Sequence, residues 1–68
     1  MHSIGQIIKE NRKRMKLTQK DLALYANVSP KFISELENGK ETIELNKLYA
    51  VLRVFDLTLK VVRYKEEE

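Results

Sequence analysis

Four helix-start signals divide this 68-residue sequence into short segments. Serine and threonine can cap the free N–H groups at the beginning of a helix, and they stand here at Ser3, Thr18, Ser29 and Thr42. The third signal is strengthened by Pro30, because proline is favoured at the first position of a helix. The sequence therefore predicts four short helices, over about 4–16, 18–26, 29–38 and 44–55.

Turn-forming residues and apolar spacing support this division. Asn27 can take up a left-handed backbone more readily than most residues, and Asn38-Gly39 ends the next segment in the same way. Between these points apolar residues recur at helical spacing, which predicts one buried face on each helix. The residues predicted to face the core are Ile4, Ile7, Ile8, Met15, Leu22, Ala23, Ala26, Ile33, Leu36, Leu45, Leu48, Val51, Leu52 and Phe55.

The period of the pattern changes after residue 56. Apolar and polar residues alternate from Leu57 to Val61, and Val62-Arg63-Tyr64 follows, so a β-strand is predicted over 57–64. A lone strand leaves N–H and C=O groups unpaired along both edges, and no second strand is predicted in this chain. We expect the segment to pair antiparallel with its own copy across a two-fold axis, through Leu57, Leu59 and Val61. The alternative is an irregular arm packed on the chain's own helices.

Size and composition exclude several classes of protein. A chain of 68 residues forms one domain, buries only about 60% of its unfolded surface and cannot enclose a large active-site cleft. It has no cysteine, one histidine (His2) and two glycines, and it shows no metal-ligand cluster, nucleophile elbow or phosphate loop. It has no apolar run of ~18 residues and no secretory signal. We therefore expect a cytoplasmic, non-enzymatic protein with no cofactor, no metal and no membrane partner.

The charge is unevenly distributed along the chain, whose formal net charge is +3. Residues 1–40 carry eight basic and four acidic residues, whereas residues 41–68 carry five basic and six acidic ones, including the terminal Glu66-Glu67-Glu68. The basic first half favours a polyanionic partner. The alternative is a solvated helix face with no partner.

The segment from 19 to 38 has the pattern of two short helices joined by a tight turn. Ala23 is small enough for two helices to cross closely, and Asn27 suits the left-handed turn position. Val28, Ile33 and Leu36 would pack the second helix onto the first. This order is typical of a helix-turn-helix. Any helical bundle needs similar residues, so an ordinary bundle is the alternative.

A longer set of residues resembles the Cro/XRE family of helix-turn-helix regulators. The resemblance covers residues 4–57 and rests on Leu17-Thr18-Gln19-x-x-Leu22-Ala23, Val28-Ser29-x-x-x-Ile33-Ser34-x-x-Glu37-Asn38-Gly39-Lys40, then Leu48, Leu52 and Asp56-Leu57. It implies a mostly α-helical, four- to five-helix lambda-repressor-like DNA-binding domain over residues 1–68, with the helix-turn-helix at about 19–38. The strand at 57–64, with Ser34-Glu35-Leu36-Glu37 and Thr42-Ile43, is similar to the HipB-like antitoxin branch, which is expected to pair this strand across a homodimer.

The family resemblance assigns DNA contacts to the helix that begins at Ser29, which would lie in the major groove. Lys31 would donate to guanine O6 and N7, and Glu35 would accept from cytosine N4 or orient Lys31. Pro30 would read only by van der Waals contact. Phe32 is equally suited to the core and to the groove. The base-reading residues implied are Ser29, Pro30, Lys31, Ser34 and Glu35.

Contacts with the DNA backbone are implied at both ends of the helix-turn-helix. Gln19 would hold a phosphate at the start of the second helix, where free N–H groups also favour an anion. The resemblance pairs Arg12 with Glu37 in a largely buried ion pair, with a phosphate contact as the second possible role of Arg12. The phosphate-binding residues implied are Thr18, Gln19, Asn38 and Lys40.

The resemblance implies a sequence-specific transcriptional repressor that binds double-stranded DNA. A homodimer would place two recognition helices ~34 Å apart on an inverted-repeat operator. The HipB-like branch further implies an antitoxin that binds a HipA-like kinase toxin and represses its own promoter. One alternative is a stand-alone Cro-like or restriction-modification controller without a toxin, and the other is a protein-interaction module on the same fold.

Overall fold

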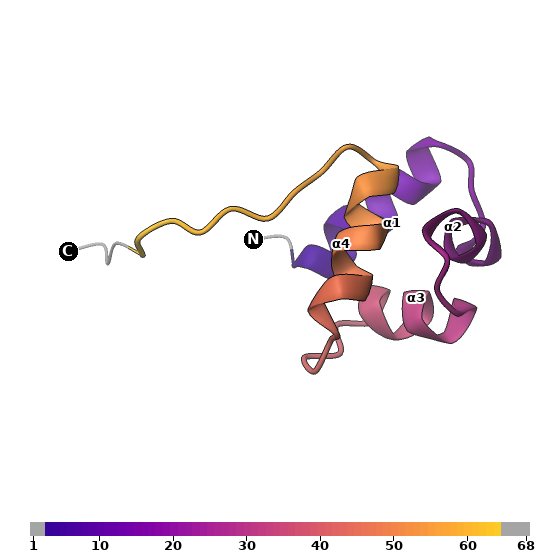
Figure 1. Ribbon diagram of the computed structural model, residues 1–68. Helices are drawn as coiled ribbons and strands as arrows, with labels where there is room; N and C mark the ends of the chain where they lie inside the picture. The colour runs from indigo at the N-terminus through magenta and orange to yellow at the C-terminus, as the bar shows by residue number, and fades with distance from the viewer. Residues whose placement is uncertain (1–2, 65–68) are drawn as a thin grey trace.

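The fold consists of four short helices and an extended C-terminal arm (Figure 1). A computed structural model describes residues 3–64. No β-strand is present within that range, and none of its helices is long and apolar enough to cross a membrane. The helices are α1 (Ile4–Arg14), α2 (Gln19–Ala26), α3 (Pro30–Glu37) and α4 (Leu45–Val54).

The first three helices begin at the residues that the sequence predicts. The hydroxyls of Ser3, Thr18 and Ser29 each accept a hydrogen bond from the backbone N–H three residues later, at 3.2, 2.9 and 3.0 Å. The prediction for Thr42 is wrong. The fourth helix begins at Leu45, so Thr42 lies too early to reach its free N–H groups, and Glu44 precedes the helix without a side-chain cap.

All four helices end in the same backbone geometry. The chain turns through a residue with positive φ, and the next N–H donates to the carbonyl five residues back, for example from Leu17 to Arg12 at 3.1 Å and from Leu57 to Leu52 at 2.9 Å. Glycine occupies one of these four positions, at Gly39 with φ +87°. The left-handed residues are Lys16, Asn27, Gly39 and Asp56.

The core takes one fully buried side chain from each helix, namely Ile8, Leu22, Ile33 and Val51. The second helix packs against both α3 and α4, and α1 packs against α3. A single layer of apolar side chains therefore holds the four helices together. The other buried apolar residues are Ala23, Ala26, Leu36, Leu48 and Leu52.

Four residues predicted to face the core are exposed instead. Ile4, Ile7, Met15 and Leu45 are between 38% and 54% exposed. Phe55 is half-buried against the core. Helical spacing alone identifies a stripe of apolar residues but does not show how far the neighbouring helices extend over it.

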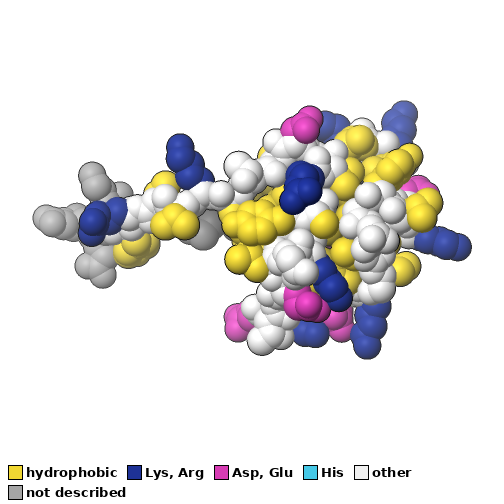
Figure 2. All heavy atoms as spheres, viewed as in Figure 1, with side chains coloured by type: hydrophobic (Ala, Val, Ile, Leu, Met, Phe, Trp, Pro, Cys, Tyr) yellow, Lys and Arg dark blue, Asp and Glu magenta, His cyan; other side chains and the backbone are white. Residues whose placement is uncertain are grey.

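The segment 57–64 leaves the end of α4 as an extended arm (Figure 1). Its first part packs on the helices, since Leu57 and Leu59 are half-buried against the core, whereas Val61 is 99% exposed. Hydrophobic side chains gather on the side of the helices next to the arm and reappear along it (Figure 2). A strand requires a neighbouring strand, so the predicted strand and its pairing across a dimer are not confirmed in this single chain.

An ion pair ties the end of α3 to α1 and α2. The Arg12 guanidinium donates from Nε and Nη2 to the two carboxylate oxygens of Glu37, at 2.7 and 3.0 Å, and from Nη1 to the Leu17 carbonyl at 2.8 Å. Gln19 Nε2 also donates to Glu37, at 3.1 Å. The Arg12 and Glu37 side chains are only 11% and 2% exposed. The pair therefore fixes the relative positions of three helices.

Gly5 allows α1 to approach α3 more closely than any other residue would. A Cβ atom at this position would clash with the Leu36 carbonyl oxygen and lie 3.1 Å from Glu37 Cα. Both are backbone atoms and cannot rotate away. Because Gly5 lies near the α3 end that holds Glu37, this close approach brings the two halves of the ion pair together.

We expect Gly5→Ala to destabilise the fold. At an exposed helix position, replacing glycine by alanine raises the free energy of unfolding by up to about 1 kcal/mol. Here the clash with the α3 backbone should lower it by about 1–3 kcal/mol, so the net effect should be destabilising. Urea unfolding at pH 7 measures the difference. The matched control is Gln6→Ala on the exposed side of α1, which should change stability by less than about 0.5 kcal/mol. A more stable Gly5→Ala variant would contradict the close approach.

The Arg12–Glu37 pair should make folding sensitive to acid. Burial raises the pKa of Glu37, but hydrogen bonds from Arg12 and Gln19 and the nearby positive charge outweigh it, so the pKa is lowered overall. The folded chain then binds fewer protons than the unfolded chain, and stability should fall as the pH drops below about 4.3, the ordinary glutamate pKa.

Urea unfolding between pH 7 and pH 3 tests this dependence. Glu37→Gln should lose about 3 kcal/mol at pH 7, because it leaves a buried guanidinium without its countercharge, and its stability should then vary less with pH than that of the wild type. Glu41→Gln, at an exposed glutamate in the α3–α4 loop, should retain the wild-type pH dependence. Parallel pH profiles for wild type and Glu37→Gln would rule out this role.

Candidate nucleic-acid interface

The helix-turn-helix is formed by α2, a tight turn and α3. Asn27 turns the chain with φ 59° and ψ 45°, and the hydroxyl of Ser29 caps the next helix two residues later. Ala23 is buried on the inner face of α2, and Ile33 and Leu36 are buried on the inner face of α3. The opposite face of α3 is therefore available at the surface while its orientation is fixed by the core.

The predicted base-reading residues lie on or beside the outer part of α3. Ser29, Pro30 and Lys31 are exposed at its first turn, and Ser34 and Glu35 are half-buried farther along. Three of them, Ser29, Lys31 and Glu35, line a common hollow of about 230 Å³, whereas Pro30 and Ser34 do not line it. The structure thus places four of them on α3 and Ser29 at its N-cap, and it brings three of the five to one concave surface.

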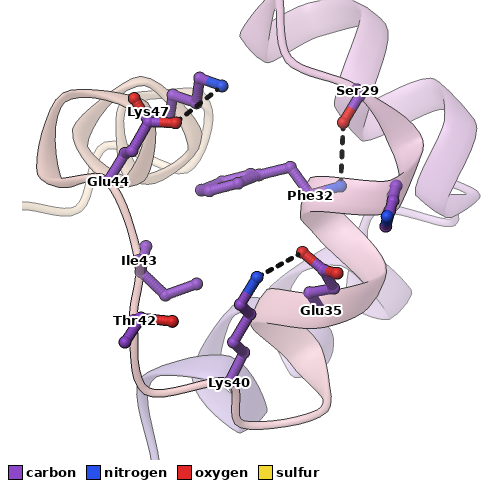
Figure 3. A pocket seen from close by; sticks show the side chains of 9 residues that line it. Ser29, Phe32, Glu35, Lys40, Thr42, Ile43, Glu44 and Lys47 are labelled. Atoms are coloured by element: carbon purple, nitrogen blue, oxygen red, sulfur yellow. Dashed lines mark hydrogen bonds and ion pairs between the residues drawn. The ribbon is translucent and has the colours of Figure 1, made fainter.

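The hollow lies between α3, the α3–α4 loop and the start of α4 (Figure 3). Phe32 projects across it from α3 toward Ile43 of the loop and Lys47 of α4. The Lys47 ammonium lies 5.9 Å from the centroid of the Phe32 ring. Phe32 is half-buried, packs against the core and also lines the hollow, so it combines the two roles that the sequence leaves open.

Two ion pairs flank the hollow on opposite sides. Glu35 Oε1 lies 3.2 Å from Lys40 Nζ, and Glu44 Oε1 lies 3.0 Å from Lys47 Nζ (Figure 3). Glu35 therefore pairs with Lys40 and not with Lys31, for which the described part of the chain shows no ion pair. The pairing joins a predicted base-reading residue to a predicted phosphate-binding residue.

The other predicted phosphate-binding residues lie at the ends of α2 and α3. Thr18 caps α2, and its hydroxyl accepts a hydrogen bond from the Asp21 N–H. The Thr18 backbone N–H donates to the Asp21 carboxylate at 2.9 Å, and this bond is the largest cause of the lowered pKa of that carboxyl group. Gln19 uses one of its two amide protons to reach Glu37. Asn38 is exposed at the end of α3, where its N–H donates to the Ser34 carbonyl at 3.0 Å.

Lys47 is the surface residue that sequence reasoning missed. It comes from α4, outside the helix-turn-helix, yet it lines the same hollow as Lys31 and Lys40. Lys47 lies in the first turn of α4, next to the buried Leu48, and its own side chain is exposed. Among residues 3–64, no group of His, Cys, Asp or Glu side chains could hold a metal ion.

Comparison with known proteins identifies relatives at the level of sequence. A helix-turn-helix family model, HTH_3, matches residues 8–62. RghRB of Bacillus subtilis (strain 168) is 41% identical over 58 residues, and y4mF of Sinorhizobium fredii (strain NBRC 101917 / NGR234) is 34% identical over 59 residues. Both are named as uncharacterized HTH-type transcriptional regulators. The alignments cover 79% and 87% of this chain, but 42% of RghRB and 78% of y4mF, so the chain spans less than half the length of RghRB.

Solved structures show the same fold. One similar chain is in the "Structure of HipA-HipB-O2-O3 complex" and another is the "MDT Protein". Each has a TM-score of 0.74 and 24% identity, over 96% of both chains. The family match begins within α1 and covers α2, α3 and α4, and the helix-turn-helix within it has the geometry described above. The chain belongs to the Cro/XRE-type helix-turn-helix family of DNA-binding transcriptional regulators, and its fold is HipB-like.

Proposed function

We propose that this protein is a sequence-specific transcriptional repressor that binds double-stranded DNA through α3. The observation that carries the proposal is the exposed first turn of α3, with Ser29, Pro30 and Lys31 at the surface of a helix anchored by Ile33 and Leu36. The N-terminal residues of such a helix read base edges in the major groove. Lys31, which has no ion pair among the described residues, is suited to guanine O6 and N7.

Phosphate contacts would hold this helix in register on the duplex. Thr18 and Gln19 stand at the start of α2, where the free N–H groups favour an anion, and Asn38 and Lys40 follow the end of α3. Gln19 Nε2 donates to Glu37, the last residue of α3, so the start of α2 lies close to the end of α3. We infer that these four residues bind the DNA backbone beside the groove that α3 enters.

We infer further that the protein is a homodimer. The arm exposes Val61, Val62 and Tyr64, and its backbone has no pairing strand among residues 3–64. Antiparallel pairing of two arms across a two-fold axis would satisfy the inner edge of each arm and cover apolar surface. Two recognition helices ~34 Å apart would then read an inverted repeat.

A toxin partner is a second, finer proposal. The likeness in fold to a chain of a HipA-HipB-O2-O3 complex, with a TM-score of 0.74, favours an antitoxin that binds a HipA-like kinase and represses its own promoter. Co-purification of the chain with the product of a neighbouring kinase gene tests this. Failure to bind that kinase, or a locus without one, would leave a stand-alone regulator.

Substitutions on α3 and α2 should weaken DNA binding in different ways. Lys31→Gln should cost about 1–3 kcal/mol on the preferred sequence and relax specificity at one base pair, and Gln19→Ala should weaken binding to all sequences alike. Binding titrations on a duplex selected from a random pool, repeated between 50 and 200 mM salt, measure both effects. The melting temperature of Gln19→Ala is measured as well, because Gln19 also donates a hydrogen bond to Glu37 and its loss could weaken the fold.

The matched control is Arg53→Gln, which removes one positive charge from the last turn of α4, at the far end from the hollow. It should leave affinity for both selected and random duplexes close to that of the wild type. Unchanged binding by both Lys31→Gln and Gln19→Ala would refute the docking arrangement.

The proposed strand predicts a face-dependent effect on dimerisation. Val61→Asp places a charge on the apolar face that also carries Leu57 and Leu59, so the variant should be monomeric at micromolar concentration. Thr58→Asp introduces the same residue on the opposite face and should remain dimeric. Size-exclusion chromatography with light scattering distinguishes the 8.0 kDa chain from twice that mass. A wild-type monomer would contradict the dimer.

A further inference from the structure

We propose that Glu35 determines DNA specificity by restraining Lys40. In the free protein Glu35 neutralises Lys40, and a cytosine whose N4 amino group donates to Glu35 releases Lys40 to a backbone phosphate. Base reading and backbone binding are then coupled through one ion pair. This inference rests on the proposed DNA-binding function and deepens it.

The local backbone holds the two residues together. Gly39 turns the chain with φ +87°, and Lys40 returns over α3 so that its N–H donates to the Glu35 carbonyl at 3.0 Å. The same two residues are joined by their side chains, with 3.2 Å between Lys40 Nζ and Glu35 Oε1. Lys40 is therefore fixed next to Glu35 at two points, and its ammonium does not simply extend into solvent.

The pair is nevertheless exposed enough to open. The side chains of Glu35 and Lys40 are 34% and 47% exposed, and ion pairs in such surroundings change an equilibrium by no more than about fivefold. A hydrogen bond to a base edge can therefore compete with it. A buried pair such as Arg12–Glu37 could not exchange partners in this way.

The charges around the hollow explain why Glu35 controls whether Lys40 can bind a phosphate. Lys47 on the opposite wall is already paired with Glu44, and Lys31 carries no ion pair with a described residue. On DNA of unrelated sequence Glu35 would keep Lys40 neutralised and would itself repel the phosphates. On the correct sequence the N4 amino group of cytosine donates to Glu35, and Lys40 turns to the backbone. A wrong base therefore costs two contacts and not one.

The test compares two duplexes of equal length, one selected from a random pool by the wild-type chain and one of random sequence. Glu35→Gln retains the size of the side chain and removes its charge. It should bind the random duplex about three- to fivefold more tightly, with a salt slope steeper by about 0.9 per recognition helix, because Lys40 now reaches a phosphate. Its preference for the selected duplex should fall about tenfold or more, through loss of cytosine discrimination.

Two further variants separate this role from a general charge effect. Glu44→Gln removes the same charge from the other side of the hollow and should tighten binding to both duplexes equally, so that their affinity ratio is unchanged. In Glu35→Gln/Lys40→Gln the tightening on random DNA should disappear, since the released lysine is absent. Thermal unfolding of each variant should match the wild type, because both pairs are exposed.

Several results would overturn the inference. The first is an unchanged random-duplex affinity in Glu35→Gln. The second is a gain in that affinity that persists in Glu35→Gln/Lys40→Gln. The third is a Glu44→Gln variant that lowers the affinity ratio as much as Glu35→Gln does. Any of these three outcomes removes the coupling while leaving DNA binding intact. Failure of the wild-type chain to bind either duplex would instead refute the proposed function itself, and the inference with it.

Discussion

The buried ion pair between Arg12 and Glu37 is the interaction on which the arrangement of the helices depends. It joins α1 to the end of α3, and Gln19 brings the start of α2 to the same carboxylate. Apolar packing is non-directional and would tolerate small rotations of α3, whereas three directed hydrogen bonds on one carboxylate would not. The absence of a side chain at Gly5 permits the close helix approach that this geometry requires.

Local chemistry accounts for the part of the fold that the sequence predicts. A serine or threonine cap and a left-handed turn act over three to five residues, so the starts of three helices and the turn at Asn27 are confirmed. The errors concern features that depend on distant parts of the chain. Leu45 is apolar but 54% exposed, Thr42 lies too far before α4 to cap it, and the need for glycine at position 5 comes only from the nearby backbone of α3.

In the candidate interface, too, the features set by nearby residues are predictable from the sequence, and those that depend on distant parts of the chain are not. The sequence predicts which residues of α3 face outward, because Ile33 and Leu36 fix the inward face. It does not predict that Glu35 pairs with Lys40, or that Lys47 joins them from α4, because both depend on the course of the loop between the helices. The DNA contacts and the strand at 57–64 stay predictions, since each requires a second molecule.

Each of the four helices contributes one fully buried side chain to the core, and this has a thermodynamic consequence. Ile8, Leu22, Ile33 and Val51 are buried by one another's helices, so no helix can detach without exposing the apolar surface of the rest. We therefore expect local opening of α3 to cost nearly as much as global unfolding, so that the chain unfolds as one cooperative unit. By linkage, a ligand that binds only the folded α3 would stabilise the whole chain, and once its free concentration exceeds its Kd the stabilisation would grow with the logarithm of that concentration. The melting temperature would then report ligand binding at α3 even though the ligand touches one helix of the four.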